Sequence, residues 1–176
     1  QIVQYLLGQS DIELNCQSGL DGSTAFFVAA FKGNLEAVQL LLDDWRVDVN
    51  RTDRKGCTPL HAAAYFGLAD ITKLLVAHHR LEVNCSNDLA WTPLHCAARK
   101  GNVEVVQVLL GEPRVEVNCS SDLGWTPLHW AARKGHAEVV QVLLGEPRVE
   151  VNCSNDSGWT PLHWAARKGD AEIVQV

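Results

Sequence analysis

Histidine recurs at a constant interval along the chain and is the first residue type to consider for acid–base or metal chemistry. Four of these histidines are spaced 34 residues apart: His61, His95, His129 and His163. Each ends a Thr-Pro-Leu-His run, so it lies three residues after a threonine that can begin a helix. A Thr-x-x-His pair at a helix start resembles a capping arrangement, in which side chains satisfy backbone groups. We therefore expect these histidines to be structural rather than catalytic.

Cysteine is the second residue type that could do chemistry, through a disulfide or a metal site. Four of the six cysteines directly follow an asparagine: Cys16, Cys85, Cys119 and Cys153. Equivalent positions of stacked helical units lie roughly 8–10 Å apart. A disulfide needs Cα atoms within about 7 Å, and tetrahedral zinc has bonds of about 2 Å. The spacing therefore predicts free thiols, and Cys57 and Cys96 lie at other positions of the repeat. Because free thiols are typical of a reducing compartment, we expect an intracellular protein, in the cytoplasm or alternatively the nucleus.

Other patterns that would favour catalysis are absent from the sequence. His78 and His79 lie near Cys85, but no Cys-x-x-Cys pair accompanies this cluster. There is no glycine-rich phosphate loop and no nucleophile elbow. Asp43 and Asp44 lie at an expected helix end and are interpreted as solvated surface. The sequence thus predicts a protein that is not an enzyme and has no metal, cofactor or small-molecule substrate.

The composition is that of a globular protein. Of 176 residues, 47% are hydrophobic and 20% are charged. No stretch approaches the roughly 18 unbroken apolar residues that a membrane-spanning helix needs, so no membrane insertion is expected. The first residues, Gln1 to Leu7, do not resemble a signal peptide. The net charge of -6 disfavours non-specific attraction to nucleic acid.

An internal repeat is the dominant feature of the chain. Thr-Pro-Leu-His begins at Thr58, Thr92, Thr126 and Thr160, always at an interval of 34 residues, and a degenerate copy begins at Thr24. We expect complete units at 24–57, 58–91, 92–125 and 126–159, flanked by partial units at 1–23 and 160–176. Because the sequence ends on an apolar, helix-like segment, 173–176, we expect a fragment of a longer array.

Each unit is expected to form two short helices and an extended loop. In the unit that begins at Thr92, this threonine suits an N-cap and Pro93 the first helical position. Gly101 can end the first helix in a left-handed conformation, and Asn102 can cap the second. Gly111 ends the second helix. Since neither helix can bury its apolar face within one unit, the units must stack.

The pattern resembles ankyrin repeats over essentially the whole chain. The resemblance rests on the run Gly124–Gly135 (Gly-Trp-Thr-Pro-Leu-His-Trp-Ala-Ala-Arg-Lys-Gly), on Glu138-Val139-Val140 and on Val151-Asn152. It implies an all-α solenoid of stacked helix-turn-helix units with extended loops or hairpins. The period of 34 exceeds the usual 33 or so, with the extra residue in Gly-Glu-Pro-Arg. Two further departures are the copy at Thr24–Phe27 and Ala90, which stands where other units have glycine.

The resemblance also implies that the repeated histidines tie neighbouring units together and that a concave groove binds a protein or peptide partner. The first set of groove positions precedes Thr-Pro: Arg54, Lys55, Cys57, Asp88, Leu89, Trp91, Asp122, Leu123, Trp125, Asp156, Ser157 and Trp159. The second set precedes the inter-helix glycine: Phe31, Lys32, Tyr65, Phe66, Arg99, Lys100, Arg133, Lys134, Arg167 and Lys168.

The tryptophans of the first set have two interpretations. Trp and Arg dominate many binding interfaces, but each Trp could instead cover its neighbouring loop, and each Arg-Lys pair could be a solvated helix end. Trp130 and Trp164, which follow the repeated histidine, are expected to be partly buried between units.

Three asparagines are candidate hydroxylation sites: Asn50, Asn118 and Asn152. Leu110 lies eight residues before Asn118, and the pair Glu116-Val117 directly precedes this asparagine. Asn50 and Asn152 also have a leucine eight residues earlier and an acidic residue followed by valine directly before them. This resembles the site of the oxygen-dependent asparaginyl hydroxylase that acts on ankyrin repeats. Asn84 departs from it, with Val76 in place of the leucine. Alternatively, each asparagine only braces its loop.

Three functions remain open at this point. The first is a protein-binding scaffold, and the second is a regulatory or targeting segment of a larger enzyme or channel. The third is nucleic-acid binding by the Arg-Lys pairs with tryptophan stacking, which the net acidity disfavours.

Overall fold

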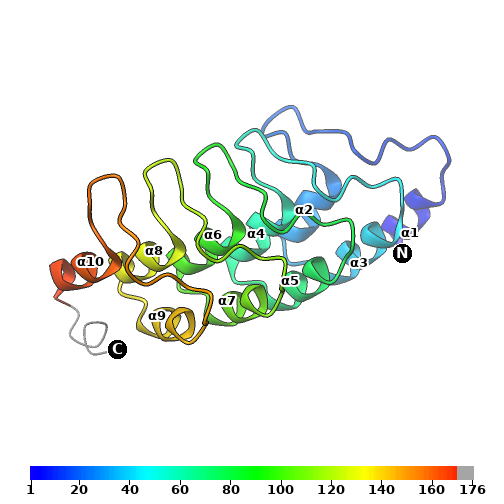
Figure 1. The fold of residues 1–176 in the computed structure, drawn as a ribbon. Helices are drawn as coiled ribbons and strands as arrows, with labels where there is room; N and C mark the ends of the chain where they lie inside the picture. The colour runs from blue at the N-terminus through cyan, green and yellow to red at the C-terminus, as the bar shows by residue number, and fades with distance from the viewer. Residues whose placement is uncertain (170–176) are drawn as a thin grey trace.

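The computed structural model describes residues 1–169, which form ten α-helices and no β-strand. The helices are α1 (Ile2–Leu7), α2 (Ala25–Phe31), α3 (Leu35–Asp43), α4 (Pro59–Phe66), α5 (Ala69–Val76), α6 (Pro93–Lys100), α7 (Val103–Leu110), α8 (Pro127–Lys134), α9 (Ala137–Leu144) and α10 (Pro161–Lys168). They form an elongated array from which long loops project on one side (Figure 1). The expected all-α solenoid is confirmed.

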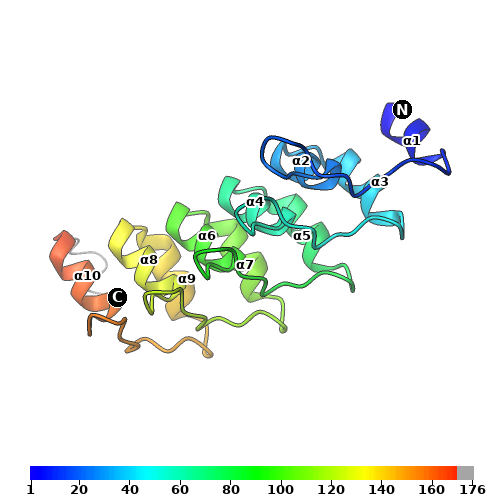
Figure 2. The ribbon, with the colours of Figure 1, turned by 90° about the horizontal axis from the view of Figure 1, so that it is seen from above.

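Two rows of helices run along the array (Figure 2). The inner helices α2, α4, α6, α8 and α10 each pack against the next inner helix, and the outer helices α1, α3, α5, α7 and α9 do the same. The pairs α2–α3, α4–α5, α6–α7 and α8–α9 contact each other across the two rows. Each unit thus packs on its neighbours, as in a solenoid. The unit boundaries stay a prediction, because a continuous repeat has no fixed first residue.

Inner helices from α4 onward begin with the same cap. The Thr58 backbone N–H donates to Nδ1 of His61 at 3.1 Å, and the His61 N–H donates to the Thr58 hydroxyl at 3.4 Å. Pro59 occupies the first helical turn, where its missing N–H sacrifices no hydrogen bond. The same capping box begins α6, α8 and α10. In the degenerate copy, the hydroxyl of Thr24 still accepts from the N–H of Phe27 at 3.1 Å.

The core is built from equivalent small and large residues of successive units. Ala63, Ala97 and Ala131 of the inner row have no exposed surface, which lets neighbouring inner helices approach closely. Buried leucines fill the space between the rows: Leu60, Leu94, Leu128, Leu75, Leu109 and Leu143. Burying one such side chain fully contributes about 1.5–3 kcal/mol, so the repeated leucines account for much of the stacking energy.

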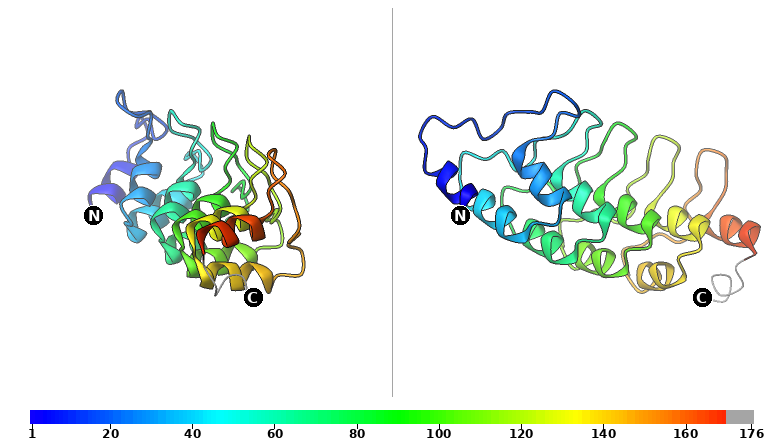
Figure 3. Two further views of the ribbon diagram at one scale, coloured as in Figure 1. Left: turned by 90° about the vertical axis from the view of Figure 1, so that its left-hand side faces the viewer. Right: turned by 180° about the vertical axis from the view of Figure 1, so that it is seen from behind.

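The loops between units double back as hairpins that all project from the same side (Figure 3). The Ser121 N–H donates to the carbonyl of Trp125 at 2.9 Å and closes one hairpin. The Asn87 N–H donates to the Trp91 carbonyl at 3.0 Å and closes the preceding one. Each hairpin therefore ends on the residue just before a capping threonine, which fixes that residue against the start of an inner helix.

An arginine in the turn after each outer helix clamps the preceding unit. Arg114 donates to the carbonyl of Val76 at 2.6 Å and to that of Leu81 at 3.2 Å, and it pairs with Glu112 at 2.9 Å. Arg148 repeats these bonds one unit later, with Leu110, Val115 and Glu146. Cations are favourable at helix C-termini, where carbonyls lack partners. The Gly-Glu-Pro-Arg turn, whose geometry the sequence left open, thus places an arginine over the end of the preceding outer helix.

None of the helices found in residues 1–169 is long and apolar enough to cross a lipid bilayer.

Candidate functional site

The hairpin bases and the ends of the inner helices form one continuous surface, which we call the inner face. It comprises the residues directly before the capping threonines of α4, α6, α8 and α10, the last two residues of these four helices, and Phe31 with the C-cap residue Lys32 of α2. These are Cys57, Trp91, Trp125 and Trp159, together with Phe31, Lys32, Tyr65, Phe66, Arg99, Lys100, Arg133, Lys134, Arg167 and Lys168. Ring and cation contacts join the two sets, as the following paragraphs show.

In the second half of the array, the inner face carries a ladder of alternating aromatic rings and guanidinium groups. Its members, the Trp–Arg ladder, are Trp91, Arg99, Trp130, Trp125, Arg133, Trp164, Trp159 and Arg167. The Arg133 guanidinium lies 5.0 Å from the ring centroid of Trp125 and 5.2 Å from that of Trp164. Arg99 lies 5.2 Å from Trp91 and Arg167 lies 5.6 Å from Trp159. At such distances each guanidinium is attracted to the ring faces.

The tryptophans of the ladder also contact one another in an unbroken series. Trp130 lies 4.9 Å from Trp91 and 4.7 Å from Trp125 between ring centroids. Trp164 lies 4.6 Å from Trp125 and 4.7 Å from Trp159. Trp130 and Trp164 are therefore packed between the tryptophans of consecutive hairpins. Both are half-buried, which confirms that they lie between units.

Trp130 and Trp164 also separate consecutive arginines. Arg99 and Arg133 lie 5.6 Å and 5.4 Å from the Trp130 ring centroid. Arg133 and Arg167 lie 5.2 Å and 5.4 Å from that of Trp164. One indole ring thus lies between each pair of neighbouring guanidinium groups and holds them one repeat apart.

Burial differs among the ladder residues. Trp125 is only 7% exposed, because it has both Trp130 and Trp164 as neighbours, whereas Trp91 and Trp159 are half-buried. Arg133 and Arg167 are exposed and Arg99 is half-buried. Within residues 1–169, none of these three arginines forms an ion pair with a carboxylate. The guanidinium edges, rather than the indole faces, are therefore what a partner would meet.

Three nitrogen atoms in the ladder are buried and have no hydrogen-bond partner among residues 1–169: Nε of Arg99 and Nε1 of Trp130 and Trp164. All three are donors. The ladder is consequently rich in N–H groups and poor in acceptors.

The first half of the inner face is aromatic instead. Phe31 and Phe66 lie 4.8 Å apart in an edge-to-face arrangement, and Phe66 lies 5.1 Å from Tyr65. Both phenylalanines are at least 40% exposed. Lys100 marks the transition to the cationic half, with its ammonium 4.1 Å from the Tyr65 ring centroid. A hydrogen bond from Lys100 also lowers the pKa of Tyr65.

The hairpin tips carry acidic and apolar side chains outside the ladder. Asp88, Asp122 and Asp156 are exposed, and Leu89 and Leu123 are 55% and 65% exposed. Adjacent tips are joined by backbone hydrogen bonds, such as that from the Asp156 N–H to the Leu123 carbonyl at 3.2 Å. The structure thus brings the predicted tryptophans and arginines together, and it holds the aspartates and leucines apart from them at the tips.

The repeated histidines bridge the units. Nε2 of His61 lies 2.8 Å from the Trp91 carbonyl, and Nε2 of His95 lies 2.8 Å from the Trp125 carbonyl. Since a carbonyl only accepts, each Nε2 donates while Nδ1 accepts from the capping threonine. Burial lowers the pKa of His61 and His95 to about 4 and also lowers that of His129. The bridging role is confirmed for His61, His95 and His129, and His163 forms the capping contacts with Thr160.

Comparison with protein families gives a match along the whole chain. The model that describes three copies of the ankyrin repeat matches at residues 1–87, 46–121, 79–155 and 114–176. The chain belongs to the ankyrin repeat family. Comparison with curated protein sequences gives no significant match. Ankyrin repeats are generally protein-interaction modules and are typically non-catalytic.

The repeated asparagine of the ankyrin units is hydrogen-bonded by the next unit at Asn50, Asn84 and Asn118. The Asn118 side chain donates to the carbonyl of Arg148 at 2.7 Å and accepts from the N–H of Glu150 at 2.9 Å. Asn50 forms the same two bonds with Arg80 and Glu82. Asn118 and Asn50 are half-buried, and Asn152 is exposed. The side chains of Asn50 and Asn118 therefore brace the turn of the following unit.

The cysteines of the ankyrin array are free thiols, and no cluster of metal-ligating side chains occurs in the part of the chain that the structure describes. The thiol of Cys85 donates to Glu82 at 3.4 Å and that of Cys119 to Glu116 at 3.3 Å. Burial and the neighbouring carboxylate raise the pKa of both thiols to about 11. Thiols with a raised pKa are poor nucleophiles, so Cys85 and Cys119 are not activated for nucleophilic attack.

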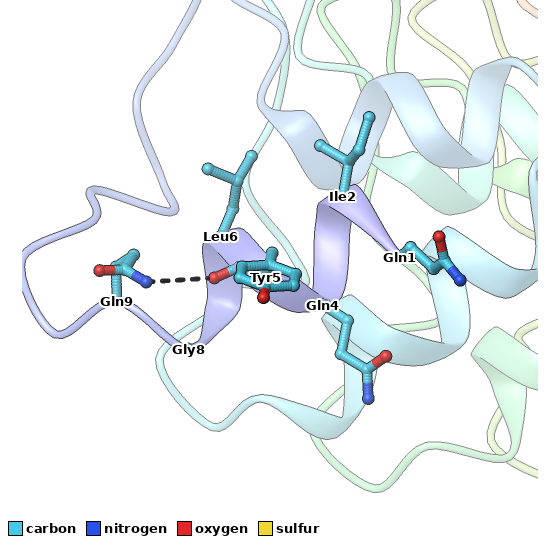
Figure 4. A pocket seen from close by; sticks show the side chains of 7 residues that line it. All are labelled: Gln1, Ile2, Gln4, Tyr5, Leu6, Gly8 and Gln9. Carbon is cyan, nitrogen blue, oxygen red and sulfur yellow. Dashed lines mark hydrogen bonds between the residues drawn. The ribbon is translucent and has the colours of Figure 1, made fainter.

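Several hollows lie at the N-terminal end of the array, away from the ladder. One, of about 810 Å³, lies against α1 and is lined by residues such as Gln4, Tyr5 and Gln9 (Figure 4). Nε2 of Gln9 donates to the Tyr5 carbonyl at 3.4 Å. Another, of about 420 Å³, is apolar and lies between α1 and the helices α2 and α3.

Proposed function

We propose that this ankyrin array is a protein-binding scaffold whose inner face is a concave groove for a protein or peptide partner. The carrying observation is the Trp–Arg ladder: Arg99, Arg133 and Arg167 are held in a row on aromatic rings and form no ion pair within residues 1–169. Arginine that is already ordered loses little side-chain entropy when a partner binds.

The two halves of the inner face support a partner with two kinds of side chain. Phe31 and Phe66 provide an exposed apolar area, and the ladder provides cations. The aspartates of the hairpin tips would repel an acidic segment and attract a basic one at their own edge of the groove. The preferred partner therefore combines apolar and acidic residues over the inner face, and a uniformly basic segment is disfavoured.

The proposed residues include those predicted from the sequence: Asp88, Leu89, Trp91, Arg99, Lys100, Asp122, Leu123, Trp125, Arg133, Lys134, Trp159, Arg167 and Lys168. Within this set we propose different roles. The arginines and lysines contact the partner, Leu89 and Leu123 add apolar contacts at the tips, and the tryptophans hold the arginines in place.

The test is calorimetric titration of an isolated partner into the parent chain and into three variants. Arg133→Glu should weaken binding at least tenfold and make it less dependent on salt. Trp125→Ala should also weaken binding, by loosening Arg133. Glu138→Ala, on the outer helix α9, is the matched control and should bind like the parent. If all four affinities are equal, the binding site does not lie on the inner face.

A second candidate function is a regulatory or targeting segment of a larger enzyme or channel. It is supported by the family, whose units serve as interaction modules, and it places the chemistry outside these 176 residues. Determining the full-length open reading frame tests it, because a catalytic or membrane domain in the same frame is required. An intracellular location, in the cytoplasm or nucleus, is also proposed; the free thiols support it.

A further inference from the structure

The spacing of the cations along the inner face carries an inference about the chemistry of the partner. Arg99, Arg133 and Arg167 come from the consecutive inner helices α6, α8 and α10. Helices in contact lie about 8–10 Å apart. The Trp130 and Trp164 rings fill the two gaps, each within 5.6 Å of the arginine on either side. The three guanidinium groups thus form a row with a period of about one helix spacing.

In an extended peptide, residues three positions apart are separated by about the same distance as neighbouring guanidinium groups of the row. A polyproline II helix has three residues per turn and rises about 9 Å per turn, and it returns the same face at each turn. A β-strand covers about 10 Å in three residues, but alternate side chains point to opposite faces. The polyproline II conformation is therefore the one that presents positions i, i+3 and i+6 to the row of arginines.

The chemistry of those positions follows from the ladder. A guanidinium group stacked on an indole keeps its planar N–H edge available, and this edge accommodates a carboxylate with two parallel hydrogen bonds. Lys100 and Lys134 add positive charge beside the row.

We propose that the Trp–Arg ladder binds an acidic segment of a partner protein in the polyproline II conformation, with a carboxylate at every third residue. This inference rests on the proposed function and specifies the partner's sequence pattern. Trp130 and Trp164 are positioning residues that set the interval, and the three arginines are the contacts.

The probe is a fluorescein-labelled peptide of four Glu-Pro-Pro repeats, titrated with the 176-residue chain at low ionic strength and followed by fluorescence anisotropy. The control peptide has the same composition with its four glutamates adjacent. We expect the spaced peptide to bind at least tenfold more tightly. Equal affinity of the two peptides, or no binding of the spaced one, would overturn the proposal.

Variants separate contact from positioning. Arg133→Gln should reduce the affinity for the spaced peptide at least tenfold, whereas Lys73→Gln, which removes an exposed cation of the outer helix α5, should leave it unchanged. Trp130→Ala keeps all three arginines and should abolish the preference for the spaced over the clustered peptide. Arg133→Lys keeps the charge without the planar group and should bind at an intermediate level. A preference unaffected by Trp130→Ala contradicts the positioning role.

Two further outcomes are decisive. If a single-stranded DNA oligonucleotide binds the ladder more tightly than the spaced peptide, the occupant is a nucleic acid and the proposal is wrong. Suppose that an isolated partner binds the Arg133→Glu variant more weakly than the parent chain, but the spaced peptide does not displace it from the parent. The partner then binds at the inner face, and the proposed pattern of a carboxylate at every third residue is wrong. A partner unaffected by Arg133→Glu would instead remove the proposed function itself.

Discussion

The Asp122 N–H donates to the carbonyl of Leu89 at 3.5 Å, the longest of the four equivalent hydrogen bonds that join adjacent hairpin tips. The cause lies next to Leu89. Ala90 has a φ of 54°, where the other units have glycine, such as Gly56 and Gly124 with φ of 71°. A Cβ placed at Gly124 would come within 2.6 Å of the Asp156 carboxylate. The methyl group of Ala90 thus keeps its neighbouring tip at a distance.

Replacing Ala90 by glycine should stabilise the array. Ala90→Gly removes the strain of a left-handed alanine and allows the Leu89–Asp122 bond to shorten, for an expected gain of about 1 kcal/mol. The measurement is the free energy of unfolding from denaturant titration. Gly124→Ala is the matched control and should lose more than about 1 kcal/mol, because it creates the same strain plus a clash. A less stable Ala90→Gly variant would contradict this explanation of the long bond.

The arginine clamp can be tested at Arg114. Arg114→Ala removes the bond to the carbonyl of Val76, at the end of α5, and the bond to the carbonyl of Leu81, beyond that helix. The expected loss in the free energy of unfolding is about 1–2 kcal/mol. Thermal unfolding of the two chains measures it. Arg51→Ala is the control, since Arg51 is exposed and reaches only the Gln17 side chain at 3.3 Å. Equal losses in the two variants would mean that the clamp contributes nothing specific.

Stability should fall in mildly acidic solution because of the buried histidines. The pKa of His61 and His95 is about 4 in the folded chain and about 6.5 when unfolded. Below pH 6.5 the unfolded chain therefore binds protons that the folded chain does not, and stability present above pH 6.5 is lost as the pH falls towards 4. At pH 5 the expected loss is about 2 kcal/mol per ring.

Denaturant unfolding between pH 7 and pH 5 measures this slope. Carboxylates with a lowered pKa, such as Asp21 with a pKa of about 2, lose their contribution to the free energy of unfolding only at lower pH. They therefore do not affect the slope between pH 7 and pH 5. His95→Gln should reduce the slope. An unchanged slope in His95→Gln would assign the pH dependence to other groups.

Hydroxylation of the repeated asparagines remains a proposal. After incubation with an oxygen-dependent asparaginyl hydroxylase, mass spectrometry should find one added oxygen on Asn50, Asn118 or Asn152. The exposed Asn152 should react first, because the Asn118 amide is held by Arg148 and Glu150. Asn84, with Val76 eight residues before it, is the internal control. No added oxygen on Asn118 or Asn152 would rule the modification out.

Local sequence predicted the elements well, because each is set by neighbouring residues. Thr58, Pro59 and His61 form one capping box within four positions, so the start of α4 could be read from the chain. The residues of the inner face were located through the resemblance to ankyrin repeats, which places them at fixed offsets from that threonine. The left-handed glycines that end the inner helices, such as Gly101, follow the same logic as the capping box. The bridging by the histidines, in contrast, was expected only from the resemblance to ankyrin repeats.

Features that depend on stacking could not be predicted in the same way. Arg114 meets the Val76 carbonyl 38 residues earlier in the chain, and only after two units have packed. The sequence pattern that could have indicated these contacts is an arginine at every 34th residue: Arg46, Arg80, Arg114 and Arg148. Similarly, Trp125 is buried because Trp130 and Trp164 lie on either side of it, so its exposure depends on the residues of two units.

Each kind of hydrogen bond between units joins two residues at a constant separation in the sequence, whichever two neighbouring units they belong to. His61 reaches the Trp91 carbonyl 30 residues ahead, and Asn84 reaches the Arg114 carbonyl at the same offset. If residues 92–125 were deleted from the gene, Asn84 would meet Arg148 in place of Arg114, and Arg148 would meet Val76. Unequal recombination by one 34-residue cassette therefore leaves every bridging bond with a partner. The number of cassettes can change in a lineage without any compensating substitution at the junction.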